Sequence, residues 1–221
     1  INGARVSVRD VTVTSQAWDG AAFHFEHVNI EDSEVSIHGC SCQQGQCFNA
    51  NTGMNVVNSS FTTTAVVECV SVFETRTPDD APGPTNITNS SFAASDVSGV
   101  LFYTDQLVLQ AVAVNVSDSP SSGIASSTVA MRVAGSTLRV GNLTGFPLGI
   151  SAPDLSVRSS TLLASNSTSR SFGMLSGERI LVEGSSIVLQ GVRTQQAGSG
   201  INSKEWIKMV DTVVEADDCG S

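Results

Sequence analysis

A six-residue pattern returns nine times along this chain, and it limits the fold more strongly than any other feature. It reads VAGSTL at residues 133–138, VRSSTL at 157–162 and VEGSSI at 182–187. Reading outward gives six more copies, and the nine copies begin at residues 8, 30, 56, 87, 109, 133, 157, 182 and 209. Repetition at a nearly fixed interval is typical of solenoids, in which each repeat forms one coil that stacks on its neighbours.

Within each copy, apolar and polar positions alternate, as they do in a half-buried strand. Positions one and six are apolar in every copy. Position three breaks the alternation and holds Gly, Asn or Asp in seven copies, namely Asp10, Asp32, Asn58, Asn89, Gly135, Gly184 and Asp211. These residue types tolerate a left-handed backbone, so we expect position three to be a corner between two short strands.

Position four carries a hydroxyl in most copies. Val11 and Val112 occupy it in two copies, which indicates that it faces the interior. A buried hydroxyl needs a hydrogen-bond partner, and the same residue one coil away, or the corner backbone, can supply it. We therefore predict a stacked ladder of Ser33, Ser59, Ser90, Ser136, Ser160, Ser185 and Thr212.

The expected fold is all-β: a right-handed parallel β-helix of about nine coils, with three short strands in each coil. An antiparallel sandwich also has short strands at regular spacing, but it does not need a matched polar residue at one interior position. We expect one domain over residues 1–221, with a Cys-rich insertion at 38–53 and a Pro-rich insertion at 74–85. Because the chain opens without Met and close to a repeat, we also expect a fragment of a longer protein.

Composition narrows the partners. The formal charge is −10 and only two residues are lysine, which argues against nucleic acid or an anionic membrane surface as a partner. No apolar run is long enough to span a membrane.

Six N-glycosylation sequons favour a secreted or cell-surface location. Asn115 lies between two inward valines and should face outward, whereas Asn142 and Asn166 should lie on an outer loop. The sequon asparagines are Asn58, Asn86, Asn89, Asn115, Asn142 and Asn166.

Four of the five cysteines lie close together in sequence. Cys40, Cys42, Cys47 and Cys69 can form two disulfides with three possible pairings, and an oxidising compartment favours this reading. The alternative is a zinc site made by His38 with Cys40, Cys42 and Cys47. Cys219 is left over, so it is either free or paired with a cysteine outside this sequence.

Catalytic residues are not predicted. Glycoside hydrolysis needs two positioned carboxylates, but the acidic pairs Asp79-Asp80 and Asp217-Asp218 fall outside the repeated strands and are expected to be solvated. Arg158 and Glu183 share position two of adjacent copies, which indicates a surface ion pair. We predict no cofactor and no metal.

The stretches MRVAGSTLRV (131–140) and LSVRSSTLLA (155–164) resemble the pectin-lyase-like β-helix superfamily, and this resemblance implies a fold only. The Val- and Ser-rich coils with sequons are also similar to the large dispersed-gene-family surface proteins of kinetoplastid protists, which implies an adhesin-like role. The function expected is a non-catalytic structural or adhesive glycoprotein, with glycans or neighbouring surface proteins as partners. Two alternatives remain: a polysaccharide lyase or hydrolase whose site lies outside this segment, and a filament subunit that stacks on itself through its ends.

Overall fold

The computed structural model describes residues 5–12, 21–42, 45–75, 84–119, 122–145, 149–169, 174–194 and 200–219. Within these ranges the chain forms strands and turns and contains no helix. The strands are β1 (Arg5–Thr12), β2 (Ala21–Phe25), β3 (Val28–Glu31), β4 (Glu34–Ser41), β5 (Gln46–Ala50), β6 (Met54–Val57), β7 (Ser60–Val67), β8 (Ser71–Thr75), β9 (Thr85–Thr88), β10 (Ser91–Val97), β11 (Gly99–Gln110), β12 (Ala113–Ser117), β13 (Ser122–Ala134), β14 (Thr137–Gly141), β15 (Thr144–Gly145), β16 (Ile150–Ser151), β17 (Asp154–Arg158), β18 (Thr161–Ser165), β19 (Thr168–Ser169), β20 (Leu175–Glu183), β21 (Ser186–Gln190), β22 (Arg193–Thr194), β23 (Ile201–Val210) and β24 (Val213–Asp217).

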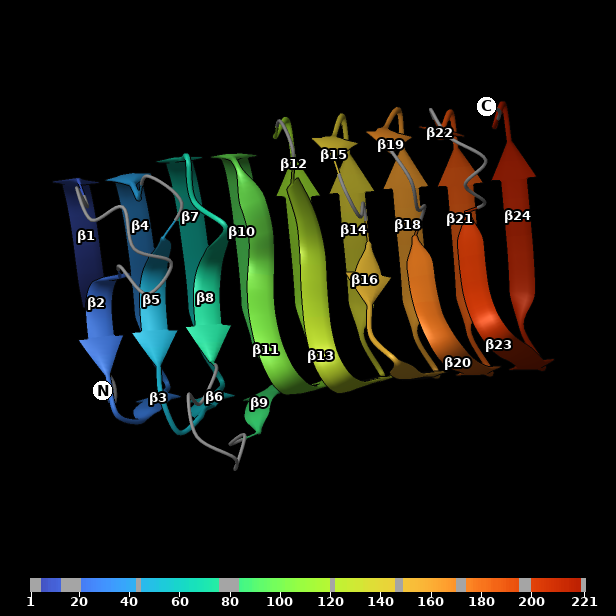
Figure 1. Ribbon diagram of the computed structural model, residues 1–221, viewed down its shortest axis with the longest axis horizontal. Coiled ribbons are helices and arrows are strands. Elements are labelled where there is room, and N and C mark those ends of the chain that lie inside the picture. Colours follow the sequence, from blue (N-terminus) through green and yellow to red (C-terminus); the bar gives the residue numbers. More distant parts are fainter. Residues whose placement is uncertain are drawn as a thin grey trace.

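The strands stack in parallel along one axis, from the N-terminal end to the C-terminal end (Figure 1). Wall 1 is a nine-stranded sheet with the order β1-β4-β7-β10-β12-β14-β18-β21-β24. Wall 2 is a twelve-stranded sheet that runs from β2 to β23, and wall 3 is the short sheet β15-β19-β22. The chain is thus a parallel β-solenoid, which confirms the predicted fold class. It makes about seven turns, slightly fewer than predicted.

Three strands per coil are clearest in the first coils. There wall 2 receives two strands from each coil, β2 then β3, β5 then β6, and β8 then β9, in addition to one strand in wall 1. In most later coils the two strands of wall 2 join into one long strand, as in β11, β13, β20 and β23, whereas β16 and β17 stay separate.

Eight of the nine copies of the sequence pattern stack in the predicted register. Position one of each copy pairs with position one of the next, through Ile30, Val56, Ile87, Leu109, Val133, Val157, Val182 and Met209. The first copy was placed wrongly, because Val6 pairs with Val35 and Val8 with Ile37. Position six of the first coil is therefore Val6, seven residues upstream of the predicted place. Apolar residues at every second position fit more than one register, so the pattern alone does not fix the register of this strand.

Position three is a left-handed corner in all eight of these copies. The φ angles lie between 46° and 57° at Asp32, Asn58, Asn89, Ala111, Gly135, Ser159, Gly184 and Asp211. The corner is a property of the coil rather than of one residue type, since even Ala111 and Ser159 adopt it.

One apolar core runs along the axis between the walls. In the N-terminal half it contains a row of phenylalanines that face one another across adjacent coils. Phe48 and Phe73 lie 5.5 Å apart between ring centroids, Phe73 and Phe102 lie 5.7 Å apart, and Phe61 stacks on Phe92 at 4.5 Å. These rings fill the core in the coils that include the longest sequence spacing, the 31 residues between Val56 and Ile87.

The two stretches predicted as insertions differ in how far the structure describes them. Residues 38–41 continue β4 and residues 46–50 form β5. In the Pro-rich stretch, residues 76–83, with Asp79 and Asp80, lie outside the described residues.

Candidate functional site

A line of buried hydroxyls runs along the solenoid inside the position-three corners; we call it the first corner ladder. Each of its six serines is 3–5% exposed and donates its hydroxyl to the carbonyl two residues before it, at 2.6–2.8 Å. The hydroxyls of Ser59, Ser90, Ser136, Ser160 and Ser185 also accept the position-four N–H of the preceding coil, each at 3.1 Å. These hydroxyls therefore bond one coil to the next while closing the corner of their own coil.

Val112 interrupts the first corner ladder because it has no hydroxyl. Its own N–H donates to Ser136, so the ladder resumes in the following coil. At the C-terminal end, the hydroxyl of Thr212 donates to Val210 O at 2.9 Å and lies 3.2 Å from Val182 O. Thr212 thus reaches the preceding coil through a carbonyl rather than through an N–H.

A second set of corners, which we did not predict, lies at the other end of the wall 1 strands. The residue four places after position six is left-handed at Asp96, Asp118, Asn142, Asn166, Gly191 and Asp218, with φ between 44° and 60°. Buried Ser119 and Ser167 follow two of these corners and accept Val97 N–H at 3.0 Å and Leu143 N–H at 3.1 Å. The signal was present in the sequence, since Asp, Asn or Gly stands at the same offset in seven copies, Gly39 included.

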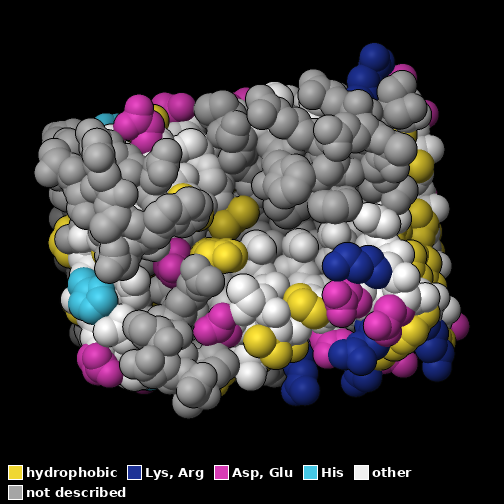
Figure 2. All heavy atoms as spheres, viewed as in Figure 1, with side chains coloured by type: hydrophobic (Ala, Val, Ile, Leu, Met, Phe, Trp, Pro, Cys, Tyr) yellow, Lys and Arg dark blue, Asp and Glu magenta, His cyan; other side chains and the backbone are white. Residues whose placement is uncertain are grey.

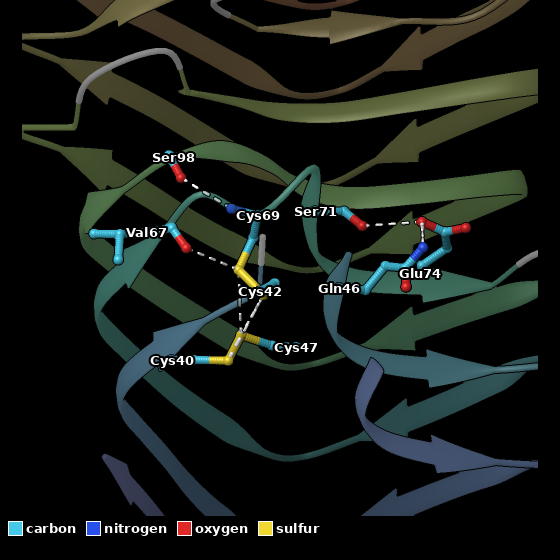
Figure 3. The surroundings of a disulfide bond; sticks show 9 residues. All are labelled: Cys40, Cys42, Gln46, Cys47, Val67, Cys69, Ser71, Glu74 and Ser98. Carbon is cyan, nitrogen blue, oxygen red and sulfur yellow. Dashed lines mark hydrogen bonds between the residues drawn. A yellow bond between two sulfur atoms is a disulfide. The ribbon is translucent and has the colours of Figure 1, made fainter. Parts of the chain in front are cut away.

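The four clustered cysteines meet inside the first coils, as Figure 3 shows. Cys40 lies near the end of β4, Cys42 follows that strand, Cys47 lies in β5, and Cys69 follows β7 at its corner. Disulfides join Cys40 to Cys47 and Cys42 to Cys69, and all four residues are at most 6% exposed. This pairing is one of the three that the sequence left open.

Cys219 is a free, exposed cysteine. It stands one residue after the left-handed Asp218, the place that Ser119 and Ser167 take in their coils. Its thiol lies 3.3 Å from Asp217 O and 3.5 Å from Leu189 O. Cys219 is therefore the end of the second corner series and lies far along the axis from the cysteine cluster.

A buried carboxylate lies near the cysteine cluster, at the right of Figure 3. Glu74 in β8 is 6% exposed and accepts the side-chain amide of Gln46 at 2.8 Å and the hydroxyl of Ser71 at 3.2 Å. Hydrogen bonds of this kind make the burial of a carboxylate tolerable. The repeats gave no sign of this group, because Gln46 and Glu74 are 28 residues apart and outside the pattern.

The sequon asparagines fall into two structural groups. Asn115 lies in the middle of β12 with its side chain exposed, as predicted from the alternation. Asn58, Asn89, Asn142 and Asn166 are left-handed corner residues, and the last two are exposed in the short turns that follow β14 and β18. Asn86 lies in β9 and is only partly exposed.

Two of the corner asparagines bond to acidic corners of the previous coil. The amide of Asn58 donates to Asp32 at 3.2 Å, and the amide of Asn142 donates to Asp118 at 2.9 Å. The amide nitrogen to which a glycan would be attached is therefore already a hydrogen-bond donor in Asn58 and Asn142. No such bond is described for the exposed Asn115.

Ion pairs lie on the outer face of wall 2 towards the C-terminal end, where Figure 2 shows basic and acidic side chains side by side. Arg158 and Glu183 form the ion pair expected from their shared position, at 2.8 Å. Arg179 donates to Asp154 at 2.7 Å, and this bond lowers the pKa of Asp154 and raises the pKa of Arg179. Each pair joins adjacent coils, and each group is at least 41% exposed, which is typical of surface pairs that stabilise weakly.

The histidines and the C-terminal acidic pair do not gather into a site among the described residues. His24, His27 and His38 are all exposed, and so are Asp217 and Asp218. His38 is bonded to Thr64 at 2.7 Å on the outer face of wall 1. His38 therefore points away from the buried sulfurs. The fourth residue of the cluster is Cys69, and not His38 as in the alternative zinc site.

The last coil exposes side chains that the other coils bury. Ile207, Met209 and Val214 are 42%, 40% and 45% exposed, although their partners in the preceding coil are fully buried. Figure 2 shows apolar atoms along the edge of the molecule at the right, the side on which Figure 1 places β23 and β24. Because β24 ends wall 1 and β23 ends wall 2, this end also has unpaired strand edges.

Comparisons of the chain with protein-family models, with curated proteins and with solved structures find no match. Among the described residues, no helix has the length and apolarity that crossing a bilayer requires.

Proposed function

We propose that this chain is a structural or adhesive β-helix segment of a secreted or cell-surface glycoprotein, without catalytic activity. The observation that carries the proposal is the use of its repeated polar residues. In the first corner ladder each serine hydroxyl is committed to its own corner, and five also accept an N–H from the coil before. Side chains used in this way hold a rod together and are not free to act on a substrate.

Two further features support an extracellular place. Paired disulfides persist in oxidising compartments, and both pairs here are buried. Asn115 offers an exposed sequon on the flat outer face of wall 1. The proposal includes two narrower hypotheses. The first is that the chain belongs to the pectin-lyase-like superfamily, and the second is that it is related to kinetoplastid surface proteins.

Binding and turnover should be measured on the same preparation. The chain, immobilised on beads, is expected to retain glycans or surface proteins from a panel, and heat-unfolded chain serves as the control. A reducing-end and unsaturated-uronide assay over a polysaccharide panel, with and without calcium, should give no product. Turnover that disappears in Glu183→Gln would refute the non-catalytic reading, and equal retention by folded and unfolded chain would refute the adhesive one.

A second candidate function is a filament subunit that stacks end to end through the coil formed by β23 and β24. Ile207, Met209 and Val214 repeat the inward positions of the solenoid and would be buried by one more coil. Burial of such side chains stabilises an interface by about 25 cal/mol per Å². Sedimentation over a concentration series should then show association that Met209→Asp abolishes, with exposed Val129→Asp on β13 as the control. A monomer at every concentration would count against this second function.

A further inference from the structure

The four buried sulfurs lie closer together than two independent disulfides require. All four Sγ atoms lie within 4.8 Å of one another. Sulfurs that are not bonded to each other are also close: Cys40 to Cys42 at 3.8 Å, Cys42 to Cys47 at 3.8 Å, and Cys47 to Cys69 at 3.9 Å. The two disulfides therefore lie directly against one another (Figure 3).

These separations match the edges of a metal tetrathiolate. Zinc binds thiolate sulfur at about 2.3 Å in tetrahedral geometry, so neighbouring sulfurs in such a site lie about 3.8 Å apart. Three of the sulfur–sulfur distances already have this value. The two bonded pairs would have to open, while the sixth pair, Cys40 and Cys69, lies within 4.8 Å.

The backbone holds the cysteines in place without the disulfides. Cys40 pairs with Val66 in the ladder between β4 and β7, and Cys42 N donates to Val67 O at 3.3 Å. On the other side, Cys69 N donates to Ser98 at 3.2 Å. Cys47 lies in β5, which pairs with β2 and β8. Cleaving the S–S bonds thus leaves the ligands on hydrogen-bonded strands, the rigid frame that a metal site needs.

We propose that Cys40, Cys42, Cys47 and Cys69, once reduced, bind one zinc ion as a buried tetrathiolate. Two molecules of a dithiol reductant supply four electrons and four protons, so that both disulfides become four thiols and both dithiols become disulfides. Zinc then replaces the four thiol protons, which pass to solvent, and four zinc–sulfur bonds form. The cluster would thus cross-link the first coils in two ways, through disulfides under oxidising conditions and through zinc under reducing ones. This inference concerns the reduced chain and does not depend on the adhesive role.

Cobalt provides the test because its visible spectrum reports tetrahedral thiolate ligands. The full chain is reduced with a dithiol, desalted under nitrogen and titrated with cobalt, while circular dichroism follows the β-sheet. We expect a thiolate–cobalt spectrum that saturates at one equivalent and disappears when zinc is added. Native mass spectrometry should then find one zinc bound with the loss of four protons.

Two single variants separate the cluster from other thiols. Cys69→Ser removes one ligand and should lose the tetrathiolate spectrum. Cys219→Ser removes the exposed free thiol and should keep both the spectrum and the one-to-one stoichiometry. The proposal is overturned if reduced wild type gives no tetrahedral cobalt spectrum, if Cys69→Ser gives the same spectrum as wild type, or if reduction abolishes the β-sheet signal and zinc does not restore it.

Discussion

Replacing Ser136 by alanine tests whether the first corner ladder stabilises the solenoid. The Ser136 side chain is 3% exposed, so water cannot take over its hydrogen bonds. Its hydroxyl donates to Ala134 O at 2.8 Å and accepts Val112 N–H at 3.1 Å. Alanine keeps the backbone and removes both bonds.

The two partners that remain are not affected equally. Ala134 O also accepts Ala111 N–H at 2.9 Å, so this carbonyl keeps a hydrogen bond in the variant. Val112 N–H has no such second acceptor among the bonds described and is left buried. One buried donor without a partner costs about 1–3 kcal/mol, which is the loss of unfolding free energy that we expect. Ser136→Val should lose less, because its added methyl groups are buried at about 0.8 kcal/mol each and because Val112 itself occupies this position.

Denaturant melts followed by circular dichroism measure the global effect, and hydrogen exchange at the Val112 amide measures the local one. Ser91→Ala is the matched control, since Ser91 is an exposed serine on β10, and its change should stay within about 0.5 kcal/mol. Val112 should exchange about 5- to 150-fold faster in Ser136→Ala, the factor that corresponds to the expected free energy. Equal stability of Ser136→Ala and wild type, with unchanged exchange at Val112, would refute the reasoning.

Three other predictions follow from corners, disulfides and sequons. Gly99→Ala should destabilise the fold by more than about 2 kcal/mol, because φ is +85° and the new Cβ would lie 2.3 Å from a backbone carbonyl oxygen. Gly135→Ala should lose only about 1 kcal/mol, because φ is +57° and the nearest atom to the new Cβ is 4.0 Å away. Denaturant melts of both variants check this, and equal losses would contradict it. Peptide mapping without reduction should find Cys42 linked to Cys69, a bond whose loop is worth about 3.5 kcal/mol, and a different pairing would show that the cluster is arranged otherwise. Intact mass of native material before and after a glycosidase should show a glycan that Asn115→Gln reduces by one; a single unmodified mass would exclude the glycoprotein.

The sequence was sufficient for the inward half of the coil. Positions one and six are apolar in every copy and pair with themselves in eight coils, because an inward position must fill the same space in each coil. Position three was readable for a similar reason, since six of the eight residues that form this left-handed corner are Gly, Asn or Asp. Ala111 and Ser159 show the limit of the argument, because they are left-handed although their residue types gave no sign of it.

Contacts between stretches outside the pattern could not be predicted. The pairing of Cys40 with Cys47 and of Cys42 with Cys69 joins β4 to β5 and to the corner after β7, and Cys47 lies outside the six-residue pattern. The hydrogen bond between Gln46 and Glu74 depends on the stacking of β5 on β8 in coils with long spacings. In both cases the residues meet through coil lengths that differ from the mean, which the pattern does not contain.

The ion pairs of wall 2 show which contacts between outward side chains the sequence pattern can predict and which it cannot. Asp154 and Arg179 each stand three residues before position one, and they pair directly, so extending the alignment by three places was enough to predict their ion pair. Lys204 and Glu178 form a similar pair at 3.3 Å, but the register shifts between Gly177 and Arg179, so equal offsets from position one no longer match. An outward pair is therefore predictable as long as no bulge lies between it and the nearest inward position. Because a bulge leaves the inward alternation on both sides intact, the sequence pattern gives no sign of the shift, and only the stacked coils reveal which outward residues become neighbours.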